Sequence, residues 1–189
     1  ESGFALTTGS QNIALGQGSL YASTDCDEVI AIGYGAMFSG NVASGADKSI
    51  GIGSFALQQL TSGAGNVAIG YRSGDAITSG HWNTIVGYNA AGALITGQSN
   101  TVIGYNAFDA QAGQSGEGND GNYNVVIGQS AMGNVDAGTH DNAVVDSNIA
   151  IGVDALLGGD FDTSDKDLLG NIAIGHNACL LYTSPSPRD

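Results

Sequence analysis

Acidic side chains at short spacing are the first residues in this sequence that suggest chemistry. The densest cluster lies in the segment GGDFDTSDKD and consists of Asp160, Asp162, Asp165 and Asp167. Carboxylate oxygens so close together are ligands that Ca²⁺ accepts, but the central glycine and terminal glutamate of an EF-hand loop are missing. A calcium site and a solvated acidic loop both remain open. Asp25, Asp27 and Glu28 form a smaller cluster with the same two interpretations.

The other residues capable of chemistry do not combine into a recognisable catalytic site. His81, His140 and His176 are far apart, and no HxH or HExxH spacing predicts a zinc site. No Ser-His-Asp arrangement can be argued from the sequence. Paired carboxylates in the acidic loops leave a surface glycosidase as a distant alternative. We therefore expect that the chain is not an enzyme and has no cofactor beyond a candidate Ca²⁺.

The dominant feature is an internal repeat, seen in segments such as NTIVGYNAA (83–91) and NTVIGYNAF (100–108). A glycine preceded by an aliphatic residue marks each copy. The nine aligned glycines are Gly16, Gly33, Gly53, Gly70, Gly87, Gly104, Gly128, Gly152 and Gly175. The shortest spacing between them is 17 residues, and longer spacings come from insertions between motifs. A fixed unit with length changes in one place predicts a solenoid, here an all-β parallel β-solenoid of about nine to ten coils over residues 1–178.

Each repeat contains a short strand. The residue before the glycine is always aliphatic and the residue three before it is β-branched, as in Ile69 and Val67. Side chains alternate along a strand, so these two positions share one face and the small residue between them, such as Ala68, points to the other. We expect the aliphatic positions to stack inside the coils, joined by a second inward ladder (Leu20, Met37) from a return strand. The Ala/Val face would then need an external cover.

Asparagine occupies the position four before the glycine in most copies. These residues are Asn12, Asn66, Asn83, Asn100, Asn124, Asn148 and Asn171. The column indicates a ladder of amides bonded from coil to coil, with ligand contact as the alternative. Tyr34, Tyr71, Tyr88 and Tyr105 follow the glycine in four copies, and they favour either a packing ladder or a surface on which a sugar stacks.

Composition restricts the partners. Glycine makes up 31 of 189 residues, and 18 acids against four bases give a net charge of −14. Such an acidic surface argues against nucleic acid and anionic membranes as partners, and no apolar run is long enough for a membrane helix. One thin coil buries few side chains, so we expect the chain to associate with itself, most simply as a trimer that packs the Ala/Val face against its axis.

The repeats NTVIGYNAF and NTIVGYNAA resemble those of phage tail-fibre proteins, often of the kind that carries a C-terminal endosialidase-type chaperone. They are also similar to the YadA-like head of trimeric autotransporter adhesins, although the asparagine is one residue nearer the glycine here. The resemblance covers residues 2–178 and implies a trimeric, left-handed β-roll. It favours a virion tail-fibre shaft that presents a receptor-binding tip. The alternative is a bacterial surface adhesin that binds host matrix or glycans.

The last eleven residues, CLLYTSPSPRD (179–189), leave the repeat and contain both prolines. They read like a translated sequencing adapter. We therefore expect residues 179–189 to be non-native and the natural chain to continue beyond Ala178.

Overall fold

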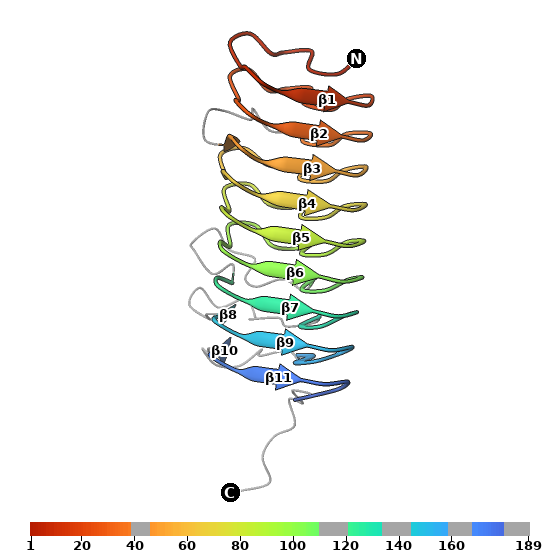
Figure 1. The fold of residues 1–189 in the computed structure, drawn as a ribbon, viewed down its shortest axis with the longest axis vertical. Helices are drawn as coiled ribbons and strands as arrows, with labels where there is room; N and C mark the ends of the chain where they lie inside the picture. The colour runs from red at the N-terminus through yellow and green to blue at the C-terminus, as the bar shows by residue number, and fades with distance from the viewer. Residues whose placement is uncertain (39–45, 110–120, 134–144, 159–167, 180–189) are drawn as a thin grey trace, which may run out of the picture.

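The computed structural model describes residues 1–38, 46–109, 121–133, 145–158 and 168–179. The chain winds into coils stacked along one axis, and nine three-residue strands form a parallel sheet in sequence order (Figure 1). The strands of this sheet are β1 (Ile13–Leu15), β2 (Ile30–Ile32), β3 (Ile50–Ile52), β4 (Val67–Ile69), β5 (Thr84–Val86), β6 (Thr101–Ile103), β7 (Val125–Ile127), β9 (Ile149–Ile151) and β11 (Ile172–Ile174). The predicted parallel β-solenoid is confirmed.

The insertions do not disturb the register of the sheet. Thr101 pairs with Val125 across an insertion just as Thr84 pairs with Thr101 without one. Two short strands, β8 (Val145–Asp146) and β10 (Leu168–Leu169), pair in parallel beside the main sheet. Most of the inserted residues (39–45, 110–120, 134–144 and 159–167) lie outside the described part of the chain. The candidate calcium ligands Asp160, Asp162, Asp165 and Asp167 lie among them.

The repeat glycine is required where each strand ends. Gly70 has φ +136°, a conformation that side-chain-bearing residues rarely adopt. A Cβ atom on Gly70 would overlap the carbonyl oxygen of Gly87, and one on Gly16 would lie 2.6 Å from the carbonyl oxygen of Gly33. The backbones of successive coils therefore approach so closely here that only glycine fits.

The core lies on the opposite face of the strands from the one expected. The middle residue of each strand points into the coil: Ala68, Ile85 and Val102 are fully buried, whereas the flanking Ile69 and Ile103 are 40% and 39% exposed. The expectation that the aliphatic positions stack inside and the Ala/Val face turns outward is therefore wrong. The interior is narrow: a Cβ on Gly51, at the middle of β3, would come within 3.2 Å of Met37 Cγ. Small residues are needed inside, so the larger ones are left outside.

The predicted second inward column is confirmed, but its residues lie in turns and not in a return strand. Leu20, Met37 and Leu57 are fully buried and lie in turns, with φ values of 48°, 52° and 49°. The third position after the repeat glycine carries only Ala or Ser, and Ala36 and Ser73 there have no exposed surface. The core of each coil is therefore one strand position packed against one turn.

No helix in the described ranges has the length and apolar character needed to cross a membrane.

Candidate functional site

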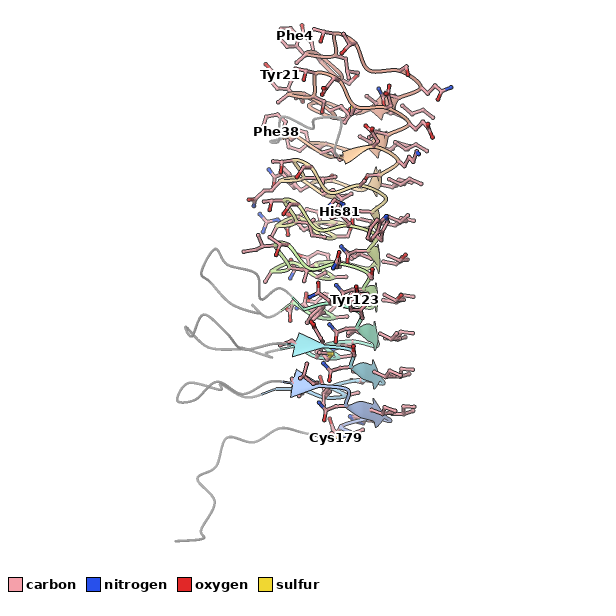
Figure 2. The ribbon with its side chains drawn as sticks, turned by 90° about the vertical axis from the view of Figure 1, so that its left-hand side faces the viewer. Phe4, Tyr21, Phe38, His81, Tyr123 and Cys179 are labelled. Atoms are coloured by element: carbon pink, nitrogen blue, oxygen red, sulfur yellow. The ribbon has the colours of Figure 1, made fainter. Side chains whose placement is uncertain are left out.

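The outer face of the nine-stranded sheet is the most unusual surface of the molecule. The first and third residues of every strand point outward and form two parallel columns. The first column contains Ile13, Ile30, Ile50, Val67, Thr84, Thr101, Val125, Ile149 and Ile172, and the second contains Leu15, Ile32, Ile52, Ile69, Val86, Ile103, Ile127, Ile151 and Ile174. We call these two columns the aliphatic face. Figure 2 shows side chains leaving the sheet on the side opposite the labelled Phe4, Tyr21 and Phe38.

The aliphatic face contains no charged residue, although the chain carries a net charge of −14. Its only polar members are Thr84 and Thr101. With about 4.8 Å between neighbouring strands, the face is roughly 40 Å long. A continuous apolar strip of this length on an acidic protein is typical of an interaction surface, because soluble monomers rarely leave such a patch in water.

A ladder of asparagine side chains holds the strands that carry this face. The Nδ2 atom of Asn83 donates to Oδ1 of Asn66 at 3.0 Å, and Nδ2 of Asn100 donates to Oδ1 of Asn83 at 2.9 Å. The same Oδ1 atoms accept from the backbone N–H groups of Asn83 and Asn100, each at 3.0 Å. Each of these Nδ2 atoms also donates to a backbone carbonyl, that of Gly97 for Asn83 and that of Gly121 for Asn100. The buried amides therefore have partners within the fold, which explains the column without a ligand.

A second polar ladder, six residues before the glycine, was not expected. The backbone N–H and Oγ of Ser10 both donate to Oδ1 of Asp27 at 2.7 Å, and the N–H of Asp27 donates to Oδ1 of Asp47 at 2.8 Å. The N–H of Ala64 donates to Nδ1 of His81 at 3.0 Å. The acceptor is an Asp in one coil and a His in another, so no single residue type marks the column. Because the residue type differs from coil to coil, the column could not be recognised in the sequence.

The smaller acidic cluster takes part in this ladder. The hydrogen bonds from the hydroxyl and N–H of Ser10 lower the pKa of Asp27. Among the described residues, no group of three His, Cys, Asp or Glu side chains is placed to hold a metal ion. The neighbouring Cys26 is fully buried, and burial raises the pKa of its thiol, so the thiolate is disfavoured.

Aromatic residues stack from coil to coil in two groups. Tyr71, Tyr88 and Tyr105 stack with ring centroids 5.1 Å and 5.3 Å apart. Phe4, Tyr21 and Phe38 form the other stack, in which Tyr21 and Phe38 occupy the fifth position after the repeat glycine. The tyrosine column is therefore a packing ladder whose members remain about half exposed, as Tyr88 is at 50%.

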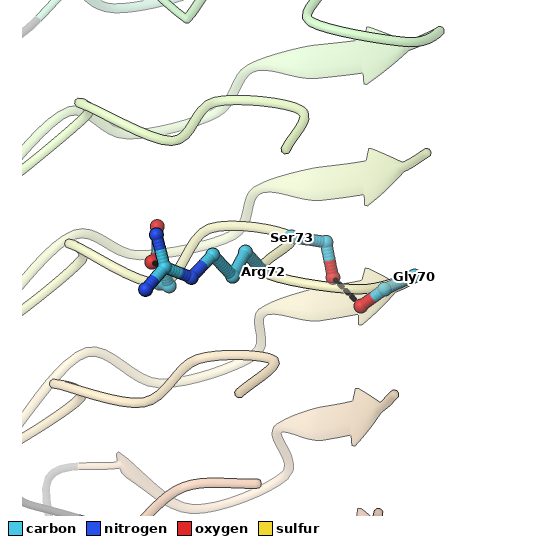
Figure 3. A network of polar contacts seen from close by, with 4 residues as sticks. Gly70, Arg72 and Ser73 are labelled. Carbon is cyan, nitrogen blue, oxygen red and sulfur yellow. Dashed lines mark hydrogen bonds and ion pairs between the residues drawn. The ribbon is translucent and has the colours of Figure 1, made fainter. Parts of the chain in front are cut away.

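Arg72 and Asp75 form an ion pair beside the tyrosine column. Arg72 Nε is 3.8 Å from Asp75 Oδ2, and its guanidinium carbon is 5.8 Å from the ring centroid of Tyr71. Figure 3 shows Arg72 next to Ser73, whose Oγ donates to the carbonyl oxygen of Gly70 at 3.1 Å. The serine closes the turn after the repeat glycine, and the exposed arginine covers the neighbouring rings.

No family model matches the chain, and neither the curated proteins nor the solved structures contain a match.

Proposed function

We propose that this chain is a segment of a trimeric extracellular fibre, with a phage tail-fibre shaft as the first candidate. The observation that supports it is the aliphatic face, which runs along the sheet without a charge while the chain carries a net charge of −14. Three copies that turn this face toward a common axis bury all of it and keep their acids in water. The proposed symmetry axis therefore runs along the aliphatic face. The sequence had predicted that the opposite face, with the Ala and Val residues, would line the axis.

Three copies suit the shape of this surface. The aliphatic face is two side chains wide and as long as the sheet, so each copy offers a narrow strip and not a broad plane. Three narrow strips close around an axis, which leaves no copy with an uncovered strip, and closed symmetry is the usual outcome for homo-oligomers. Burying each partly exposed Ile adds on the order of 1 kcal/mol.

The repeated architecture supports a spacing function. Every coil has the same strand and turn glycine, and seven of the nine have the asparagine, so coils add length without changing the cross-section. The described residues show no cluster suited to metal chemistry. A rod of stacked coils suits a shaft that holds a receptor-binding tip away from a particle. A bacterial adhesin head is the second candidate, because aromatic side chains are exposed along the rod.

The mass of the full chain in solution tests the trimer. Light scattering should give three times the 18.9 kDa of one chain. Ile69→Asp places a carboxylate on the aliphatic face and should reduce the mass to that of a monomer. Gln59→Asp adds the same charge at an exposed turn position and should remain a trimer. A wild-type mass of 18.9 kDa would overturn the proposal.

A further inference from the structure

The first three coils enclose a cavity of about 440 Å³ on the surface of the rod. Its lining includes Tyr21 and Phe38 as well as Gln17 and Tyr34. Gly18 directly follows Gln17 in the sequence, and Gly35 directly follows Tyr34. This volume lies within the range of roughly 300–1,000 Å³ that small-molecule sites occupy. The cavity is separate from the aliphatic face, because Tyr21 and Phe38 lie on the other side of the rod (Figure 2).

Two glycines allow aromatic rings to lie where they line the cavity in these coils. Gly18 and Gly35 occupy the second position after the repeat glycine, with φ values of 74° and 63°. Later coils carry a side chain at this position with a similar φ, as in Asn89 and Asn106. A Cβ on Gly18 would lie 3.0 Å from the ring of Phe38, and one on Gly35 would lie 3.0 Å from the ring of Phe55. The rings of Phe38 and Phe55 therefore pack directly over these two glycines, and a side chain at either position would displace the ring.

The cavity combines aromatic rings with hydrogen-bonding groups, and Glu1 is the one charged residue of its lining. The ring planes of Tyr34 and Phe55 are nearly perpendicular, at 88°, so they do not cover each other face to face. The amide of Gln17 and the tyrosine hydroxyls of the lining bring both donors and acceptors. Apolar ring surface beside amides and hydroxyls matches a sugar, which has a C–H face and a rim of hydroxyl groups.

Other ligand classes fit less well. An extended peptide would need free backbone groups, but the N–H groups of Gly18 and Gly35 already donate to the carbonyl oxygens of Glu1 and Gln17. Tyr21 and Phe38 stack nearly parallel at 5.3 Å, so the ring faces that would surround an organic cation partly cover each other. The net charge of −14 opposes acidic sugars.

We propose that this cavity is a binding site for a neutral saccharide, carried by the shaft itself. The extracellular source of that saccharide rests on the proposed fibre function, but the binding chemistry does not. The site would give the rod a weak contact with a glycan-covered surface, repeated once per subunit. Repetition of weak sites in one oligomer raises the overall avidity without new contacts.

The test uses the full chain and three neutral probes: maltotriose, cellotriose and triacetylchitotriose. Saturation-transfer NMR should detect binding of at least one of them, and a titration should give its dissociation constant. Gly18→Asn introduces the residue that coils further along carry at this position and should weaken binding at least about tenfold, because its side chain displaces the Phe38 ring from the cavity wall. Tyr34→Ala should weaken it to a similar degree.

Two matched variants serve as controls. Ser130→Asn enlarges the side chain at the second position of a coil outside the cavity, and Tyr88→Ala removes a tyrosine equivalent to Tyr34; both should bind like the wild type. Sialyllactose and tetramethylammonium are measured as charged comparison ligands. The inference is overturned if no neutral probe binds, if only these charged ligands bind, or if Gly18→Asn binds the sugar as well as the wild type. The mass of each sample is measured as well: a trimer that binds no sugar overturns this inference alone, and a monomer that binds sugar overturns only the trimer.

Discussion

Ile85 occupies the space that a side chain on Gly74 would need: a Cβ on Gly74 would lie 3.0 Å from Ile85 Cδ1. In another layer the turn residue is the large one and the strand residue is the glycine: Met37 fills the space beside Gly51. The same turn and strand columns supply both pairs. In these layers the narrow interior is therefore filled by one large and one small residue, and either column can supply the large one.

Ile85→Ala should lower the free energy of unfolding by about 3 kcal/mol, because it leaves a cavity opposite Gly74. The double variant Gly74→Leu/Ile85→Ala recreates the combination of a turn leucine, such as Leu57, with a strand alanine, such as Ala68. It should recover most of the loss, and denaturant unfolding of the two single variants and the double variant measures this coupling. Additive effects would show that the two positions do not share one space.

Removing one amide from the asparagine ladder should be costly. Asn100→Val leaves the N–H of Asn124 without the Oδ1 acceptor to which it donates at 3.0 Å. An unsatisfied buried donor costs about 1–3 kcal/mol, which a thermal or denaturant melt detects. Asn100→Ser should lose less, because a serine Oγ in this column can accept, as Ser49 Oγ does from the N–H of Asn66. Equal losses for Val and Ser would contradict the ladder as the cause.

The second ladder should make stability depend on pH through Asp27. Hydrogen bonds from the hydroxyl and N–H of Ser10 lower the pKa of Asp27 below its ordinary 3.8, so the folded state favours the ionised form. Its contribution is fully present above 3.8 and disappears as the pH falls through the lower folded-state value. Asp27→Asn should therefore reduce the melting temperature at neutral pH, and the difference from the wild type should vanish in strong acid.

Asp109 provides a control of opposite sign. Burial raises its pKa above 3.8, so its ionised form is disfavoured in the folded state. Asp109→Asn should raise the melting temperature at neutral pH, and that gain should disappear as the pH falls toward 3.8 and the wild-type carboxyl becomes protonated. If both variants show the same pH dependence, the overall charge of the chain, and not these two local environments, controls its acid response.

The architecture could be predicted from the sequence because the same kinds of residue recur at the same positions of the repeat. The glycine column predicted a close backbone approach, which Gly70 and Gly87 show, and the asparagine column predicted the ladder geometry. Which face of the strand is buried was predicted wrongly, because a three-residue strand that is apolar on both sides gives no hydropathy contrast. The reciprocal sizes of Leu57 and Ala68, or Gly74 and Ile85, were the available signal. The acceptors Asp27 and His81 differ in type, so their common position could not be recognised without coordinates.

The central claim is that other copies of the chain cover the aliphatic face. Its most direct test is the rate at which N-ethylmaleimide alkylates a cysteine introduced there, in a Cys179→Ser background that removes the other exposed thiol. Ile69→Cys probes the face and Gln59→Cys probes an exposed turn, while the native Cys26 is buried in both. The account predicts that the thiol at position 69 reacts many times more slowly than the one at position 59. Equal rates would contradict it.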